Sequence, residues 1–308
     1  MHVINFRMRD LKKLKELYIE PGVFNTEATM LVLKRKSFPD HVERVFKFLD
    51  LQLKYADLSD DPYVFSKKLF TVTTLNTLSE YKNMEELVIP DTLVYVDGEL
   101  SGFGLPIVKN HKNLGVIINS DKLPLAKKLP YLTQLGGIIE KVQKVEGNYN
   151  LHFGDLNEYN FILGEDNKVK AIDLDSSYLG IGEPLSMAYY LLKNQYIKSI
   201  PEKYKSTDKG IVIPSNNTDL YCYNMIILNA LSKENLYRMD INTYYEYMWY
   251  LETLDLPELL LDAFHNIYIP KNNINPKEAL GEIDPTLEER LNFNTFKKTL
   301  EKSKKYYI

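Results

Sequence analysis

The chain has 308 residues, 44% of them hydrophobic and 26% charged, and its formal net charge at pH 7 is −4. This composition is typical of globular domains and excludes collagen-like, disordered and disulfide-rich proteins. No block of Lys and Arg predicts a surface for nucleic acid or for an acidic membrane, so we expect neither partner. The single cysteine, Cys222, excludes an internal disulfide and a zinc site built from cysteines, which favours a cytoplasmic location.

The apolar segments that secretion or membrane insertion requires are missing from the sequence. The first 20 residues alternate charged and apolar side chains, without the run of about 7–15 apolar residues found in a signal peptide. The best apolar run, Met225-Ile226-Ile227-Leu228, is far shorter than the roughly 20 residues of a membrane-spanning helix. We therefore predict a cytoplasmic protein.

The first third of the chain predicts a mixture of helices and strands. Apolar residues recur at helical spacing in three segments, and β-branched and apolar residues alternate in a fourth. We expect helices at 11–17, 39–53 and 62–82, and a strand at 29–36.

A β-hairpin and a connector are predicted next. Two short apolar runs, at 93–96 and 102–105, flank an Asp-Gly-Glu turn. The following stretch, 109–122, is rich in Asn and Lys and is typical of a connector. At about 100–200 residues per domain the length suggests two lobes, and this connector places them at 1–108 and 109–308.

The second lobe is predicted to be mainly helical. Helices are expected at 124–135 and 136–145, followed by a strand-loop-strand block at 152–173. From about residue 217 onward the chain is predicted to be helical, with faces rich in Tyr. We interpret the tyrosines of 244–250 as packing residues of an amphipathic helix.

The most informative pattern lies in the strand-loop-strand block. Asp155 is followed five residues later by Asn160, and Asp173 lies beyond the tight turn 164–167. Mg²⁺ prefers hard oxygen ligands and bridges nucleotide phosphates, while a separate carboxylate can accept the proton of an attacking hydroxyl. Asp155 fits the base, and Asn160 with Asp173 fits the metal ligands.

These residues resemble a known signature. Gly154-Asp155-Leu156, Asn160 and Ile172-Asp173 are similar to the G-D-L-x-x-x-N…I-D pattern of the protein-kinase-like superfamily, in particular its divergent bacterial and phage members and the aminoglycoside and choline kinase branch. The resemblance implies a bilobal α+β fold, with an antiparallel sheet and helices in a small first lobe and a larger helical second lobe. It also implies ATP and Mg²⁺ as cofactors.

The resemblance further implies which residues of the first lobe bind the nucleotide. Lys34 matches the strand lysine that holds the α- and β-phosphates, and Lys36, on the same strand face, is its competitor. Gly22 stands where a glycine-rich loop caps the phosphates. Leu105 lies in the strand that would enter the hinge beside the nucleotide. Glu43 is a candidate partner for Lys34.

In the second lobe, two residues are assigned by the same resemblance. Asp219 matches an aspartate that opens a buried helix, and we expect it to brace the backbone of the catalytic loop. It is also a candidate helix N-cap, and the two roles can coexist. His152 lies one position too early for the family's histidine and is a poor catalytic candidate. Residues 176–214 correspond to the activation segment.

Departures from the family pattern keep several functions open. The glycine loop retains one glycine, no glutamate stands at a convincing helix position, and Asp175 replaces the glycine of the D-F-G motif and is a further candidate metal ligand. The leading hypothesis is a phosphotransferase that transfers the γ-phosphate to a hydroxyl acceptor, with protein Ser or Thr slightly favoured over a small molecule. The alternatives are a pseudokinase or nucleotide-binding scaffold, and a kinase-like fold that transfers AMP.

Overall fold

The structure is a computed structural model, in which residues 1–7, 9, 29–33, 44–48, 62–181, 205–206, 211–236, 239–267 and 273–306 are described. It has mixed α and β structure with small sheets, which confirms the predicted α+β class. The chain divides into two compact units. Unit 1 consists of Met1–Asn110 and Lys170–Ser176, and unit 2 consists of His111–Val169 and Ser177–Ile308.

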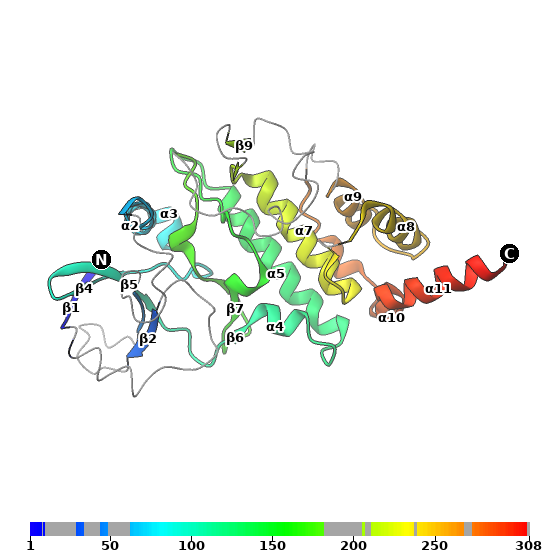
Figure 1. Cartoon of the computed structure of the whole chain (residues 1–308), viewed down its shortest axis with the longest axis horizontal. Helices are drawn as coiled ribbons and strands as arrows, with labels where there is room; N and C mark the ends of the chain where they lie inside the picture. The colour runs from blue at the N-terminus through cyan, green and yellow to red at the C-terminus, as the bar shows by residue number, and fades with distance from the viewer. Residues whose placement is uncertain are drawn as a thin grey trace. The chain divides into compact units, whose positions relative to one another are not determined.

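Unit 1 contains a five-stranded sheet with the order β1-β4-β5-β3-β2. Figure 1 labels β1, β2, β4 and β5 of this sheet. β1 runs parallel to β4, and the other neighbouring strands are antiparallel. The hairpin between β4 and β5 turns at Asp97 and Gly98, which both have positive φ, as a two-residue turn of this kind requires. This confirms the predicted hairpin. The strands are β1 (His2–Phe6), β2 (Thr29–Leu33), β3 (Arg44–Phe48), β4 (Thr92–Val96) and β5 (Glu99–Pro106).

The helix predicted at 39–53 is wrong at 44–48, where the chain forms β3. β3 lies between β2 and β5 and pairs with both, with Val45 opposite Val32 on one side and Leu105 on the other. A short apolar segment fits a helix or a strand equally well by periodicity. The pairing partners on both sides, which are distant in sequence, decide between the two.

The predicted strand at 29–36 is confirmed at Thr29–Leu33. The predicted helix at 62–82 is confirmed as α2 (Pro62–Thr77) and α3 (Ser79–Lys82), which are interrupted at Leu78. Val72 and Leu75 of α2 are fully buried. The expected helix at 11–17 lies outside the described residues.

The predicted connector at 109–122 contains regular structure. β6 (Lys112–Asn113) pairs with β7 (Phe161–Leu163), and α4 (Leu114–Ile118) follows it directly. The side chain of Asn113 accepts a hydrogen bond from the Val116 N–H and so caps α4. The sequence does not indicate β6, because a strand of two residues has no periodic pattern of its own and forms only by pairing with β7.

The predicted strand-loop-strand block is confirmed. β7 is followed by a turn in which the Gly164 N–H donates to the Lys168 carbonyl over 3.0 Å. β8 (Val169–Ala171) begins after this turn, and the chain passes from unit 2 to unit 1 within it. Two short 3-10 helices, η1 (Glu158–Asn160) and η2 (Leu174–Ser176), lie before β7 and after β8.

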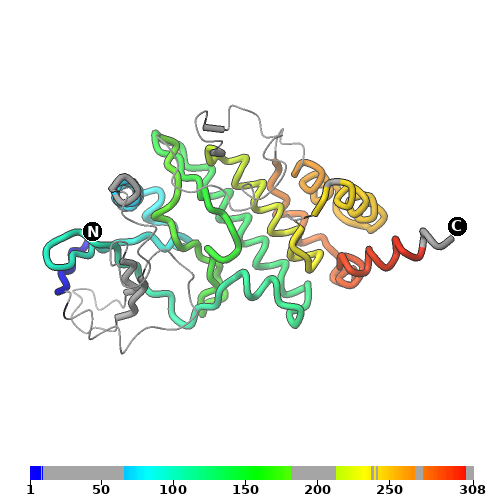
Figure 2. Tube along the Cα trace, viewed as in Figure 1, coloured from blue at the N-terminus to red at the C-terminus, as the bar shows by residue number. Residues whose placement is uncertain are grey.

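The two helices predicted at 124–135 and 136–145 form one continuous helix, α5 (Leu125–Gln143) (Figure 2). Gly136, where we expected the division, is a packing position instead. The Tyr223 hydroxyl lies against it and donates to the Leu132 carbonyl over 2.8 Å. A glycine is therefore required here by a neighbouring helix, and the helix continues through it.

Tyr223 belongs to α7 (Asn216–Ser232), which is buried along almost its whole length from Thr218 onward. A capping box formed by Ser215 and Thr218 starts this helix. Because α7 is buried on every side from Thr218 onward, it forms the centre of unit 2, and α5 packs against it.

The remaining described elements of unit 2 are mostly helical, as predicted. Tyr247 packs against Phe293 and Phe296 with ring centroids 5.2 Å apart in both pairs, which joins α8 to α11. This confirms that the tyrosine-rich segment packs as an amphipathic helix. The elements are β9 (Lys205–Ser206), β10 (Ile211–Val212), α8 (Ile241–Glu252), α9 (Glu258–Asn266), η6 (Ala279–Glu282), η7 (Pro285–Leu287), α10 (Glu288–Leu291) and α11 (Phe293–Tyr306). In the described part of the chain, no helix combines the length and the apolar character needed to cross a membrane.

Replacing Gly136 with Ala is expected to lower the free energy of unfolding by about 1–3 kcal/mol, because overpacking forces neighbouring groups apart. An ideal Cβ at this position would lie 2.3 Å from the Tyr223 hydroxyl oxygen. Gly137→Ala in the same helix is the matched control, since nothing lies within 4 Å of its added Cβ. We expect the control to be stabilised by about 0.5–1 kcal/mol through lower backbone entropy. Urea unfolding measures both, and equal effects would contradict the packing role.

Candidate functional site

The loop that contains Asp155 is held by a buried carboxyl group. Asp219, in the first turn of α7, is 1% exposed, and its Oδ2 accepts a hydrogen bond from the Phe153 N–H over 3.1 Å. Burial raises the pKa of Asp219 to about 8, while the N–H groups of Phe153 and Gly154 act in the opposite direction. The prediction that Asp219 braces the loop backbone is confirmed. The N-cap role is wrong, because Ser215 occupies that position.

Gly154 allows the loop to turn directly before Asp155. Its φ is +70°, in the region that favours glycine. The Asp155 N–H then donates to the Phe153 carbonyl over 2.7 Å, which closes a tight turn. The sequence signature therefore has a glycine at position 154 because the chain takes a left-handed conformation there, directly before Asp155.

The structure brings Asp155 and Asn160 together. The Asn160 Nδ2 donates to the Asp155 carbonyl over 2.8 Å and to its carboxylate Oδ2 over 3.3 Å. Asn157 supports this turn, because its side chain accepts from the Tyr159 N–H and donates to the Asp155 carbonyl. Both predicted site residues are half-buried. The spacing of five residues thus closes a local, hydrogen-bonded loop.

α4 supports the same loop through η1. The Asn113 side chain donates to the Tyr159 carbonyl over 2.9 Å, and the Asn119 side chain donates to Glu158 Oε1 over 3.1 Å. Gly115 lets the two elements approach closely, since a Cβ there would lie 2.9 Å from the Tyr159 ring. The segment predicted to be a plain connector therefore helps to position Asn160.

The orientation of Asn160 fits a metal ligand. Because its Nδ2 faces Asp155, its Oδ1 lies on the other side of the amide, and no described residue donates a hydrogen bond to that oxygen. Amide and carboxylate oxygens are the hard donors that Mg²⁺ prefers. Within the described residues no three His, Cys, Asp or Glu side chains form a metal-binding group. Asparagine is not among these four residue types. The oxygen donors at this loop are the amide of Asn160 and the carboxylate of Asp155.

Asp173 and Asp175 lie in unit 1, in the segment that follows β8. Asp173 has a φ of +62°, which aspartate tolerates better than most residues. Asp175 belongs to η2 and is 1% exposed, and its Oδ2 lies 3.0 Å from the Nζ of Lys68. Lys68 also donates to the Ser176 hydroxyl over 2.8 Å. Asp175, a candidate metal ligand by sequence, is thus a partner of a lysine in α2.

Sequence reasoning missed Lys68, although a signal for it is present. Lys68 lies between Phe65 and Val72 at the helical spacing of the apolar face of α2. A lysine in an apolar stripe predicts a buried partner, because a buried charge must be paired. The sequence alone does not show which acid is the partner, since Asp175 is 107 residues away.

The other predicted nucleotide-binding residues are placed only in part. Leu105 lies in β5 and is buried, and it pairs with Val45 of β3. Gly22, Lys34, Lys36 and Glu43 lie outside the described residues.

His152 is not suited to acid-base chemistry near neutral pH. Burial lowers its pKa to about 4, and a hydrogen bond with Asn216 opposes this shift. Its ring stacks on Tyr178, and the two residues exchange backbone hydrogen bonds of 2.8 and 2.9 Å. Its Nδ1 is buried, and no partner for it lies among the described residues. His152 therefore fixes the start of the loop in its neutral form.

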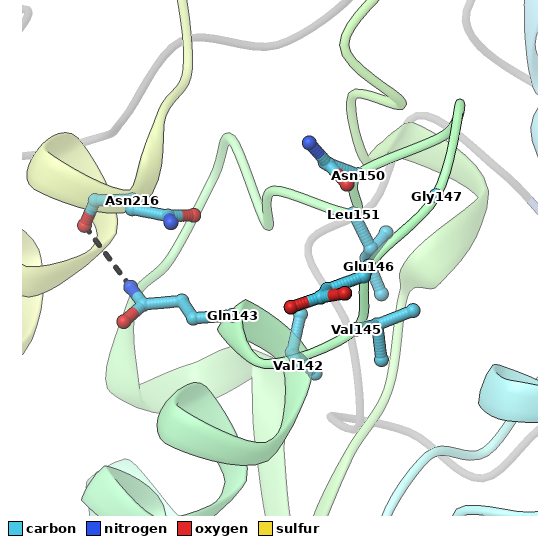
Figure 3. Close-up of a pocket in the computed structure, with 8 residues that line it drawn as sticks. All are labelled: Val142, Gln143, Val145, Glu146, Gly147, Asn150, Leu151 and Asn216. Atoms are coloured by element: carbon cyan, nitrogen blue, oxygen red, sulfur yellow. Dashed lines mark hydrogen bonds between the residues drawn. The ribbon is translucent and has the colours of Figure 1, made fainter.

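A pocket of about 320 Å³ lies near the start of the same loop (Figure 3). Gln143, at the end of α5, donates to the Asn216 carbonyl across it over 3.1 Å. The pocket contains none of the predicted site residues, so it is separate from the Asp155–Asn160 pair. Its lining consists of Val142, Gln143, Val145, Glu146, Gly147, Asn150, Leu151 and Asn216.

Comparisons with known proteins give no family assignment. The chain matches no model of a known protein family, and it matches no curated protein sequence.

Replacing Asp219 with Ala is expected to lower the free energy of unfolding by about 1–3 kcal/mol, because the buried Phe153 N–H is left without an acceptor. Asp219→Asn keeps one acceptor oxygen and is expected to cost less. Urea unfolding of the two variants at pH 7 measures the difference. Equal losses in both variants would contradict a role for the hydrogen bond.

Replacing His152 with Phe is expected to change how stability depends on pH. The pKa of His152 is about 4 in the folded chain, against an ordinary value of 6.5. Its contribution to stability is therefore present above pH 6.5 and is lost as the pH falls toward 4. The difference in unfolding free energy between wild type and variant should fall by up to about 1.4 kcal/mol per pH unit in this window. Urea unfolding across the window tests this, and a difference independent of pH would refute it.

Proposed function

We propose that this chain is an ATP-dependent phosphotransferase that transfers the γ-phosphate to a hydroxyl acceptor, with protein Ser or Thr slightly favoured over a small molecule. The observation that carries the proposal is the Asp155–Asn160 contact on a loop held by the buried Asp219. A carboxylate beside an amide, on a backbone fixed by a buried helix, is the arrangement that phosphoryl transfer needs for a base and a neighbouring metal ligand.

Asp155 is proposed to orient the acceptor hydroxyl and to accept its proton. Its side chain is half-buried, so an acceptor can reach it, while the Asn160 amide limits the rotation of its carboxylate. A base must be held within hydrogen-bond distance of the proton that it removes. The support from Asn157 and Asp219 keeps the loop backbone in place for this step.

From the sequence pattern, Asn160 and Asp173 are proposed as the residues that would hold Mg²⁺. The fit rests on the Oδ1 of Asn160, which no described residue engages, and on the hard-oxygen chemistry of both side chains. When bound, Mg²⁺ neutralises phosphate charge and so favours transfer. Lys34 or Lys36 is proposed to bind the nucleotide phosphates, with the loop at Gly22 covering them and Leu105 contacting the base.

Asp155→Asn and Asp173→Asn are each expected to reduce phosphate transfer about 100-fold or more, because they remove the base and a metal ligand respectively. The measurement is transfer from labelled ATP in the presence of Mg²⁺, to the protein itself and to a lysate as the source of acceptors. Asp262→Asn, which changes an exposed aspartate of α9, is the matched control and should retain activity.

The outcomes separate the proposed function from the alternatives. Transfer that is unaffected by both substitutions would overturn the assignment of the site. A thermal shift with Mg²⁺–ATP but no transfer in the wild type would indicate a nucleotide-binding scaffold. Modification of the product by AMP, identified by intact mass, would indicate an AMP transferase.

A further inference from the structure

Contacts on both sides of Asp173 attach its segment to other parts of unit 1. On its N-terminal side, the Ala171 N–H donates to the Glu86 carbonyl over 2.7 Å, and the Val88 N–H donates to the Ala171 carbonyl over 2.9 Å. Leu87 and Ala171 accordingly form a parallel bridge. These bonds involve only backbone atoms, so they fix the path of the chain just before Asp173.

On its C-terminal side, the side chain of Lys68 in α2 binds the segment. The Lys68 ammonium lies 3.0 Å from Asp175 Oδ2 and 2.8 Å from Ser176 Oγ. Lys68 is 8% exposed and Asp175 is 1% exposed, so solvent screens this ion pair only weakly. One ammonium group therefore binds two consecutive residues of η2 and fixes the orientation of that turn relative to α2.

Asp173 lies between these two attachments and has the left-handed φ of +62°. A non-glycine residue keeps such a conformation when the surrounding structure determines it. Loss of the Lys68 bonds would remove a contact that holds the backbone on the C-terminal side of Asp173. The direction of the Asp173 carboxylate then depends on the ion pair two residues later.

We propose that Lys68 is a positioning residue that sets the metal-binding geometry of Asp173 by holding Asp175 and Ser176. This inference rests on the proposed function, because Asp173 needs such positioning only if it is a metal ligand. It also assigns Asp175 a role different from metal binding. The Asp175 Oδ2 is already engaged by an ammonium group, and a second cation at the same oxygen would be repelled by it.

The test measures metal affinity directly. Mn²⁺ is titrated into the full chain together with a non-hydrolysable ATP analogue, and free Mn²⁺ is followed by its paramagnetic resonance signal. Lys68→Met is expected to weaken Mn²⁺ binding about 10-fold or more, the usual effect of losing a residue that orients a metal ligand. Lys68→Arg keeps the charge and donors and should restore most of the affinity. Lys82→Met, at an exposed lysine of α3, is the matched control and should bind like the wild type.

A double variant addresses loss of folding. Lys68→Met alone leaves the Asp175 carboxylate buried without its partner, whereas Lys68→Met with Asp175→Leu replaces the whole ion pair by apolar side chains, which proteins often tolerate. Urea unfolding without metal establishes that the double variant folds. Its Mn²⁺ affinity should be as weak as that of Lys68→Met, because apolar contact supplies no directional bond to the turn.

The inference is overturned if the folded double variant binds Mn²⁺ with the same affinity as the wild type. The ion pair would then have only a structural role. Tighter binding by Lys68→Met would also overturn it, because Asp175 would then act as a ligand released from the lysine. Asp173→Asn distinguishes failure of the proposed function. If wild type and Asp173→Asn bind Mn²⁺ equally, both the metal site and the positioning role are wrong.

Discussion

The buried side chain of Asp219 fixes the position of the backbone at the start of the loop before β7. An aspartate without access to water must find polar partners inside the fold, and the backbone N–H groups at Phe153 and Gly154 supply them. α7 is buried from Thr218 onward, so Asp219 has a fixed position, and the loop bonded to Asp219 is held there as well. The left-handed Gly154 and the contact between Asp155 and Asn160 follow from that fixed starting point.

The proposed metal ligands are held by two kinds of interaction. Asn160 is positioned locally, by hydrogen bonds within its own loop and by the support of α4. Asp173 depends on residues that are remote in sequence, because Glu86 and Lys68 bind the chain on either side of it. Local interactions re-form wherever the loop forms, whereas the remote ones require unit 1 to be folded. The two proposed ligands therefore differ in how much of the protein each depends on.

The parts of the fold that were predictable from the sequence are those in which neighbours in the chain decide the conformation. The helix at 62–82, the hairpin around Asp97-Gly98 and the turn after β7 have clear local patterns, and the Asp155–Asn160 pair needs only five residues. The expectations failed where distant partners decide. β3 was expected to be a helix because its partners β2 and β5 are not visible in its own residues. Gly136 was expected to divide two helices because Tyr223, which occupies its space, lies in α7. The partner of Lys68 was hidden for the same reason.

The division of the chain has a practical consequence for dissecting the protein. Lys170–Ser176 belongs to unit 1, although the residues on both sides of it belong to unit 2. No single cut in the backbone can then yield both units intact. A fragment that starts at His111 contains Asp175 and Ala171 but lacks their partners Lys68 and Glu86. A fragment that ends at Asn110 contains Lys68 and Glu86 but lacks Asp175 and Ala171. Either half expressed alone would lack the contacts between Lys170–Ser176 and the rest of unit 1. Biochemical work should therefore use the full 308-residue chain.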